Sequence, residues 1–139
     1  MPIVASEIRA ATDGHGHCID ITPDIESRVR KAGLRAGVVH LFVVGSTAAL
    51  TTIEFEPGCV QDLKDTFERI APERGDYRHH ERWGDHNGHS HMRASLLGPH
   101  LTVPVVDGRL TLGTWQQVIL VDFDDRPRDR TVVVQTIGD

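Results

Sequence analysis

Histidine is concentrated in one stretch of this 139-residue chain. Six of the nine histidines lie within 22 residues, at His79, His80, His86, His89, His91 and His100. Imidazole is the commonest protein ligand for metal ions and has a pKa near neutrality, so the cluster suits metal binding or proton transfer. The stretch contains no HExxH or comparable zinc motif, so a solvated loop with surface histidines is the alternative interpretation.

Three of these histidines could converge on one ion. His89 and His91 would face the same side of an extended segment, and His79 or His80 would complete a metal site with them. The predicted cofactor is a divalent metal ion, zinc or magnesium. Glu54, on a neighbouring predicted strand, would act as a further ligand or general base, with a purely structural carboxylate as the alternative.

Other side chains could bind the phosphate group of a small ligand. Ser46 and Thr47 follow Gly45 at the end of an apolar run, where a glycine lets an anion approach the backbone closely. Arg93 lies at the start of a predicted short helix, whose electropositive end also favours an anion. Trp115 could stack on a ligand. The alternatives are a strand-end bulge, a surface arginine and a core aromatic residue.

Apolar periodicity indicates the elements that must position these residues. Extended segments are predicted at 3–11, 17–21, 38–44, 48–55, 101–106, 109–114, 115–123 and 131–137, with hairpins joining the first two, the fifth and sixth, and the last two. Helices are predicted over about 23–32, from 60 to about 70, and over 92–97, while 71–90 is expected to be a functional loop. The sequence therefore predicts an α+β fold, mainly an antiparallel β-sheet sandwich with two or three helices, in a single domain covering 1–139.

Composition limits the partners and the compartment. The formal net charge is -5 and no block of Lys or Arg is present, which argues against nucleic acid and anionic membranes as partners. The longest apolar run, 38–44, is far shorter than the roughly 20 residues that a membrane-spanning helix needs. Two cysteines without CxxC spacing and no visible export signal predict a cytoplasmic protein.

Five segments carry a resemblance to a known family. They are STAALT at 46–51, GHSHMRASLLG at 88–98, VPV at 103–105, DGRL at 107–110 and LGTWQQ at 112–117. Together they resemble the YjbQ-like family, some members of which are called secondary thiamine-phosphate synthases, over about residues 3–138. The resemblance implies an α+β sandwich of antiparallel sheets that assembles as a homotrimer, with a polar site between subunits.

The resemblance also implies which residues form the site. It adds Asp85, Asn87 and Ser95 to the residues named above. The catalytic residues would then be Glu54, Asp85 and His91. The residues that bind the substrate would be Ser46, Thr47, Asn87, Arg93, Ser95 and Trp115. His91 matches the family pattern whereas His86 has no secure counterpart, so His91 is expected to matter more. Members usually carry a histidine where Gly45 stands, so we expect low or absent synthase activity.

Three functions follow from these features. The resemblance implies a thiamine-phosphate synthase, which joins hydroxymethylpyrimidine diphosphate and thiazole phosphate with loss of pyrophosphate. The first alternative is a metal-assisted hydrolase that uses His79, His89 and His91, with Glu54 activating the bound water. The second is a non-enzymatic module that binds a small ligand or a metal. The expected partners are a small phosphorylated ligand and further copies of the chain.

Overall fold

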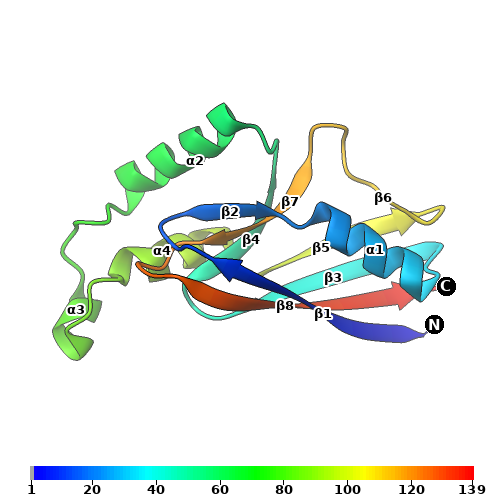
Figure 1. Ribbon diagram of the computed structural model, residues 1–139, viewed down its shortest axis with the longest axis horizontal. Helices are drawn as coiled ribbons and strands as arrows, with labels where there is room; N and C mark the ends of the chain where they lie inside the picture. The colour runs from blue at the N-terminus through cyan, green and yellow to red at the C-terminus, as the bar shows by residue number, and fades with distance from the viewer. Residues whose placement is uncertain (1) are drawn as a thin grey trace.

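The computed structural model describes residues 2–139, which form eight strands and four helices (Figure 1). In chain order these are β1 (Ile3–Thr12), β2 (His17–Asp20), α1 (Thr22–Ala32), β3 (Ala36–Val44), β4 (Ala48–Ile53), α2 (Pro57–Ile70), α3 (Arg78–Trp83), α4 (Gly88–Leu97), β5 (His100–Val106), β6 (Arg109–Leu110), β7 (Gln117–Asp122) and β8 (Arg128–Gly138). None of the helices within the described range is long and apolar enough to cross a lipid bilayer.

The strands form two antiparallel sheets. The larger sheet has the order β1-β8-β3-β5-β6 and the smaller has the order β2-β7-β4. The predicted α+β antiparallel sandwich is therefore confirmed. The number of helices is four rather than two or three, because the segment expected to be a loop contains α3 and the first turn of α4. Their apolar side chains are too few to produce a helical pattern in the sequence.

The small sheet lies in the middle of the molecule. One face packs against the large sheet and α1 through Leu50, Val118 and Leu120, and the other face carries Ile119 and Val121, which pack against α2 and α4. This double cover explains why β7 is apolar on both faces. Both faces of β7 are therefore covered within the chain itself.

Two of the three predicted hairpins are wrong. β1 pairs with β8 and β2 pairs with β7, so the turn at 13–16 carries the chain from one sheet to the other instead of closing a hairpin. β7 and β8 likewise lie in different sheets. The third hairpin is confirmed, since β5 pairs with β6, although β6 has only two residues. A turn signal marks a reversal of the chain but does not say which strand the chain then joins.

Three such changes of sheet meet at one end of the sandwich. They are the connections 13–16, 45–47 and 123–127, and backbone bonds join the first to the last at His15 N to Asp124 O (2.7 Å) and Gly16 N to Asp122 O (2.8 Å). In Figure 1 this end lies near α3 and α4, opposite the two chain termini. Where the chain leaves the hydrogen-bonded pairing of a sheet, its backbone N–H and C=O groups need other hydrogen-bond partners. Polar side chains are therefore expected at this end.

Candidate acid–base site

A buried ionic network occupies the end of the sandwich where the strands change sheets. Arg130, on β8, donates from Nε and Nη2 to the Asp122 carboxylate at 2.7 and 2.9 Å, and from Nη2 to Thr47 Oγ1 at 2.6 Å. Thr12 Oγ1 donates to the same carboxylate at 2.5 Å. Thr47 lies in one sheet-changing connection, and Thr12 and Asp122 are the last strand residues before the other two, so all three changes of sheet meet in one network.

Asp124 continues this network toward the helices. It accepts from Thr47 Oγ1 at 3.0 Å, from Arg128 Nε at 3.0 Å and from Asn87 Nδ2 at 3.3 Å. Burial alone would raise the pKa of Asp124, but hydrogen bonds from the Asp125 backbone, Thr47 and Asn87 outweigh it and hold the pKa well below its usual range. The pKa of Asp122 is lowered in the same way, since the bonds from Arg130 and Thr12 outweigh its burial. Both carboxylates are thus anions at neutral pH.

The network fixes the first turn of α4. Asn87 is the residue before α4, and its side chain ties the helix start to Asp124. Ser90 Oγ donates to Phe123 O at 2.5 Å, and both Asn87 and Ser90 are buried. The start of α4, which carries His89 and His91, is therefore held rigidly against the sheet-changing end.

His91 forms a close pair with His79 of α3. The two ring centroids lie 4.5 Å apart with the planes inclined at 58°. His79 Nε2 also lies 3.5 Å from Asp85 Oδ1. These two groups form an ion pair when the His79 ring is protonated. Burial, and then the positive charge of protonated His79, lower the pKa of His91, although Asp124 and Asp85 partly oppose this. His91 is therefore a neutral imidazole at pH 7, a state that can accept a proton.

His89 points elsewhere. It is 1% exposed, and its Nε2 lies 3.3 Å from Ser90 Oγ. Burial, followed by the charge of Arg93, lowers the pKa of His89, so this ring is also neutral at pH 7. Its environment is that of a core histidine.

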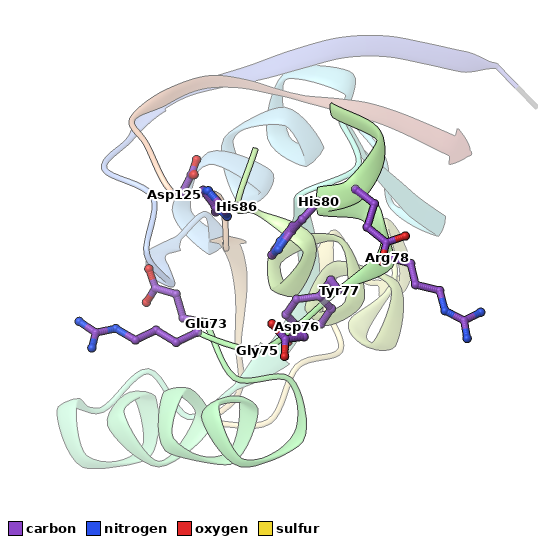
Figure 2. A pocket seen from close by; sticks show the side chains of 10 residues that line it. Glu73, Gly75, Asp76, Tyr77, Arg78, His80, His86 and Asp125 are labelled. Atoms are coloured by element: carbon purple, nitrogen blue, oxygen red, sulfur yellow. The ribbon is translucent and has the colours of Figure 1, made fainter. Parts of the chain in front are cut away.

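His80 and His86 lie on the other side of α3 and line a pocket of about 910 Å³ (Figure 2). Their ring centroids are 5.2 Å apart, and the Tyr77 ring lies 5.3 Å from His80. Gly88 N donates to His80 Nε2 at 3.0 Å, so Nδ1 must carry the proton of the neutral His80 ring. The histidine pair and this pocket adjoin, because His79 and His80 are neighbours on α3 with centroids 6.4 Å apart.

Buried polar atoms without a hydrogen-bond partner gather here. Within residues 2–139 five such side-chain atoms occur, namely His79 Nε2, Asp85 Oδ1, Asn87 Oδ1, His89 Nδ1 and Asp125 Oδ1. All belong to the segment 79–89 or to Asp125 in the neighbouring connection. Three of them still face an opposite charge, since His79 Nε2 lies 3.5 Å from Asp85 Oδ1 and Asp125 Oδ1 lies 3.6 Å from Arg126 Nε. Buried polar atoms that lack a hydrogen bond are costly, so their concentration here marks this end of the molecule as a candidate site.

Several residues predicted as site members belong to this end of the molecule. Thr47 and Asn87 are in the ionic network, and Asp85 faces His79. Ser46 is exposed beside them. Gly45 adopts φ +128°, and a Cβ there would lie 2.6 Å from Arg130 Nη1. A histidine at position 45 would therefore displace the guanidinium that pairs with Asp122.

Other predicted members lie apart. Glu54 follows β4 at the end opposite Thr47, about 20 Å of strand away, and exposed Trp115 precedes β7 at that same far end. Arg93 donates to Glu68 Oε2 at 2.7 Å and to Ala71 O at 2.9 Å, which ties α4 to the end of α2. Ser95 Oγ donates to the His91 carbonyl oxygen at 2.7 Å. The structure does not bring these four side chains to the histidine pair.

The sequence interpretation missed Arg130, Asp122 and Asp124. A signal was present, because Asp122 interrupts an apolar strand at a position where a buried side chain is expected. An isolated aspartate in such a strand indicates a buried ion pair.

Comparisons with known proteins agree with this fold. The family model for UPF0047 protein YjbQ-like matches residues 6–139. The chain belongs to the YjbQ-like family. A UPF0047 protein of Methanothermobacter thermautotrophicus is 33% identical over 138 residues, covering 99% of this chain and 94% of the relative. One from Archaeoglobus fulgidus is 35% identical, covering 94% and 99%.

Solved structures of YjbQ-like proteins superpose closely on this chain. A protein from Sulfolobus solfataricus, described as YbjQ-like and of unknown function, has a TM-score of 0.94 at 30% identity and covers 99% of both chains. A hypothetical protein from Aeropyrum pernix has a TM-score of 0.91 at 29% identity, covering 98% of this chain and 99% of that one.

The predicted functions must be corrected. The family and its relatives are described only as UPF0047 and of unknown function, which gives the thiamine-phosphate synthase assignment no support, so that prediction is wrong. Among the described residues no group of three or more His, Cys, Asp or Glu side chains could hold a metal ion. His79, His89 and His91 therefore do not fit a metal site. The predictions of a metal-assisted hydrolase and of a metal-binding module, which depend on that site, are wrong as well. Zinc or magnesium binding as such stays a prediction.

Proposed function

We propose that this protein is a metal-independent acid–base catalyst whose reacting groups are His91 and His79. The observation that carries the proposal is the pairing of two imidazoles at 4.5 Å, one of which faces Asp85. Two such rings can accept a proton from a substrate and return one to it in the same reaction.

The surroundings of the two rings differ and suggest their roles. His91 is the base, because burial and the neighbouring charge on His79 keep it neutral. His79 is the acid, because Asp85 Oδ1 lies 3.5 Å from its Nε2 and orients the ring. Asp85 acts through His79 and is a positioning residue. Asn87 and Asp124 keep α4, and hence His91, in place.

The experiment compares variants in metal-free buffer containing EDTA. The probes are p-nitrophenyl acetate and p-nitrophenyl phosphate, since both reactions are accelerated by general acid–base groups. We expect His91→Gln and His79→Gln to reduce the rate by about 10²–10⁴-fold. His100→Gln is the matched control and should leave the rate unchanged, because His100 forms a separate histidine pair with His40. His86→Gln tests the prediction that His91 matters more.

Two outcomes would overturn the proposal. One is a rate for His91→Gln equal to that of the parent on both probes, which includes the case of no turnover by either protein. The other is a parent rate that EDTA abolishes. An NMR titration gives a second readout that needs no substrate: His79→Gln should raise the pKa of His91, because a neighbouring positive charge is removed.

The predicted homotrimer remains a proposal. Its support is the exposure of apolar side chains on the large sheet, with Phe42 43% and Val44 53% exposed on β3 and Val106 57% exposed on β5. We expect a mass by light scattering of three times the 15.4 kDa of one chain, reduced by Phe42→Ser. A mass of one chain would contradict it. The cytoplasm remains the proposed compartment, in keeping with the two free thiols Cys18 and Cys59.

A further inference from the structure

A cavity lies beside the histidine pair, next to His80 of α3. It has a volume of about 910 Å³ and is lined by side chains from the segment 73–86 and by Asp125. Neither His79, His91 nor Asp85 lines it, so what the pocket binds can be asked independently of the acid–base proposal. A volume of this size accepts a small organic molecule.

Three rings form one wall of the pocket. The Tyr77 and His80 rings are inclined at 62° with centroids 5.3 Å apart, and the His80 and His86 rings are inclined at 77° at 5.2 Å. Figure 2 shows His80 between the other two rings, directed into the space below Asp125. The faces of aromatic rings attract cations, so a wall of inclined rings can receive an organic cation.

The wall is held in place by the backbone. A Cβ at Gly88 would lie 2.6 Å from the Tyr77 Cβ and 2.9 Å from His80 Nε2, so only glycine lets the chain approach both rings. The Gly88 N–H bond to His80 Nε2 fixes the proton of the neutral ring on Nδ1. His80 thus offers a fixed hydrogen-bond donor to a ligand.

The charges around the pocket favour a cation. Four carboxylates line it, Glu73, Asp76, Glu81 and Asp125, against the two guanidinium groups of Arg74 and Arg78. A third guanidinium, that of Arg126, lies 3.6 Å from Asp125 Oδ1 and leaves one negative charge in excess. Figure 2 shows Arg78 directed away from the space between His80 and His86. The negative charges of Glu73 and Asp125 also reach the buried His89, where they oppose the lowering of its pKa by burial and Arg93. A concave surface with excess negative charge concentrates cations.

We propose that the pocket walled by Tyr77, His80 and His86 binds a small organic cation, an amine or quaternary ammonium group on a ligand whose acceptor atom meets the Nδ1–H of His80. The rings contact the cationic group, and the carboxylates of Asp76 and Glu73 supply the opposite charge. A phosphorylated ligand without a cationic group is disfavoured in this pocket.

The test is an NMR titration of the full-length, isotope-labelled protein. The probes are tetramethylammonium chloride, sodium chloride at equal ionic strength and sodium phosphate. We expect saturable shifts of the Tyr77, His80 and His86 ring signals with tetramethylammonium alone. Asp76→Asn removes one exposed carboxylate from the pocket and should weaken binding about three- to tenfold. Asp62→Asn removes the same charge from the outer face of α2 and should leave binding unchanged.

The result can overturn the inference in three ways. Equal shifts with sodium chloride would mean that the pocket has no selectivity for an organic cation. Saturable binding of phosphate at the same rings would mean that it is an anion site. Equal affinities of Asp76→Asn and Asp62→Asn would mean that the pocket carboxylates play no part. None of these outcomes bears on the acid–base proposal, whose test uses different residues and different probes.

Discussion

The histidine pairs His40–His100 and His79–His91 differ in their surroundings, and only those of the second pair suit a reactive site. His40 of β3 and His100 of β5 have ring centroids 5.6 Å apart on the large sheet, where His40 Nδ1 lies 2.8 Å from Thr102 Oγ1. His79 and His91 are closer, at 4.5 Å, and stand between Asp85 and the buried Asp124 network. Proximity of two imidazoles is therefore common to both pairs, and the carboxylates around one pair make the difference.

The largest effect is expected from removing the network beneath the reactive pair. Arg130→Met leaves Asp122, which is 0% exposed, without its cation. Breaking one half of a buried ion pair costs about 3–5 kcal/mol, so the free energy of unfolding in urea should fall by that amount. Arg9→Met is the control, because the ion pair of Arg9 with Glu7 is exposed and worth about 1 kcal/mol or less. Equal losses in the two variants would mean that Asp122 is not held by Arg130.

A smaller loss of stability is expected from changing Gly88, the glycine that packs behind the rings of Tyr77 and His80. Gly88→Ala places a methyl group 2.6 Å from the Tyr77 Cβ, which cannot be relieved by a flexible side chain. Overpacking of this kind costs about 1–3 kcal/mol, and it should move the NMR signals of His80 and His86. In Gly113→Ala the new methyl group meets Gln116 at Oε1 (3.6 Å) and Cβ (3.7 Å), both ordinary contacts. If both variants unfold at the parent's urea concentration, the backbone of Gly88 does not hold the ring wall.

The sequence predicted the parts of the fold that depend on local pattern. Ile25 and Val29 repeat at helical spacing between Pro23 and Gly33, and the structure has α1 there, ending at Gly33 in the left-handed conformation. The turn Asp107-Gly108 joins β5 and β6 as expected, with positive φ at both residues. Local conformational preferences decide both features.

Pairing between sheets could not be predicted in this way. The turn at 13–16 has the composition of a hairpin turn, yet β1 and β2 enter different sheets. Part of the candidate site could not be predicted for the same reason. Arg130 and Asp122 are recognisable only when β7 and β8 are known to bracket a change of sheet, whereas the histidine cluster is visible in the sequence because its members are close together.

The smallest effect concerns the dependence of stability on pH. The pKa values of His89 and His91 are lowered in the folded protein from the ordinary value of 6.5. Between the lowered values and 6.5 the unfolded chain binds more protons than the folded one, so protonation favours unfolding there. The free energy of unfolding should therefore be constant above about pH 7 and decrease as the pH falls through 6.5.

This loss is separate from that of the carboxylates. Asp122 and Asp124 have folded pKa values below 3.8, so their contribution is present above that pH and is lost only as the pH falls further. Urea unfolding at intervals from pH 7.5 to 5 isolates the histidine effect. His89→Asn and His91→Asn should each reduce the slope over this range, and the double variant should reduce it most. A slope that stays at the parent value in the double variant would assign the pH dependence to other groups and remove the evidence that these two rings are neutral in the folded state.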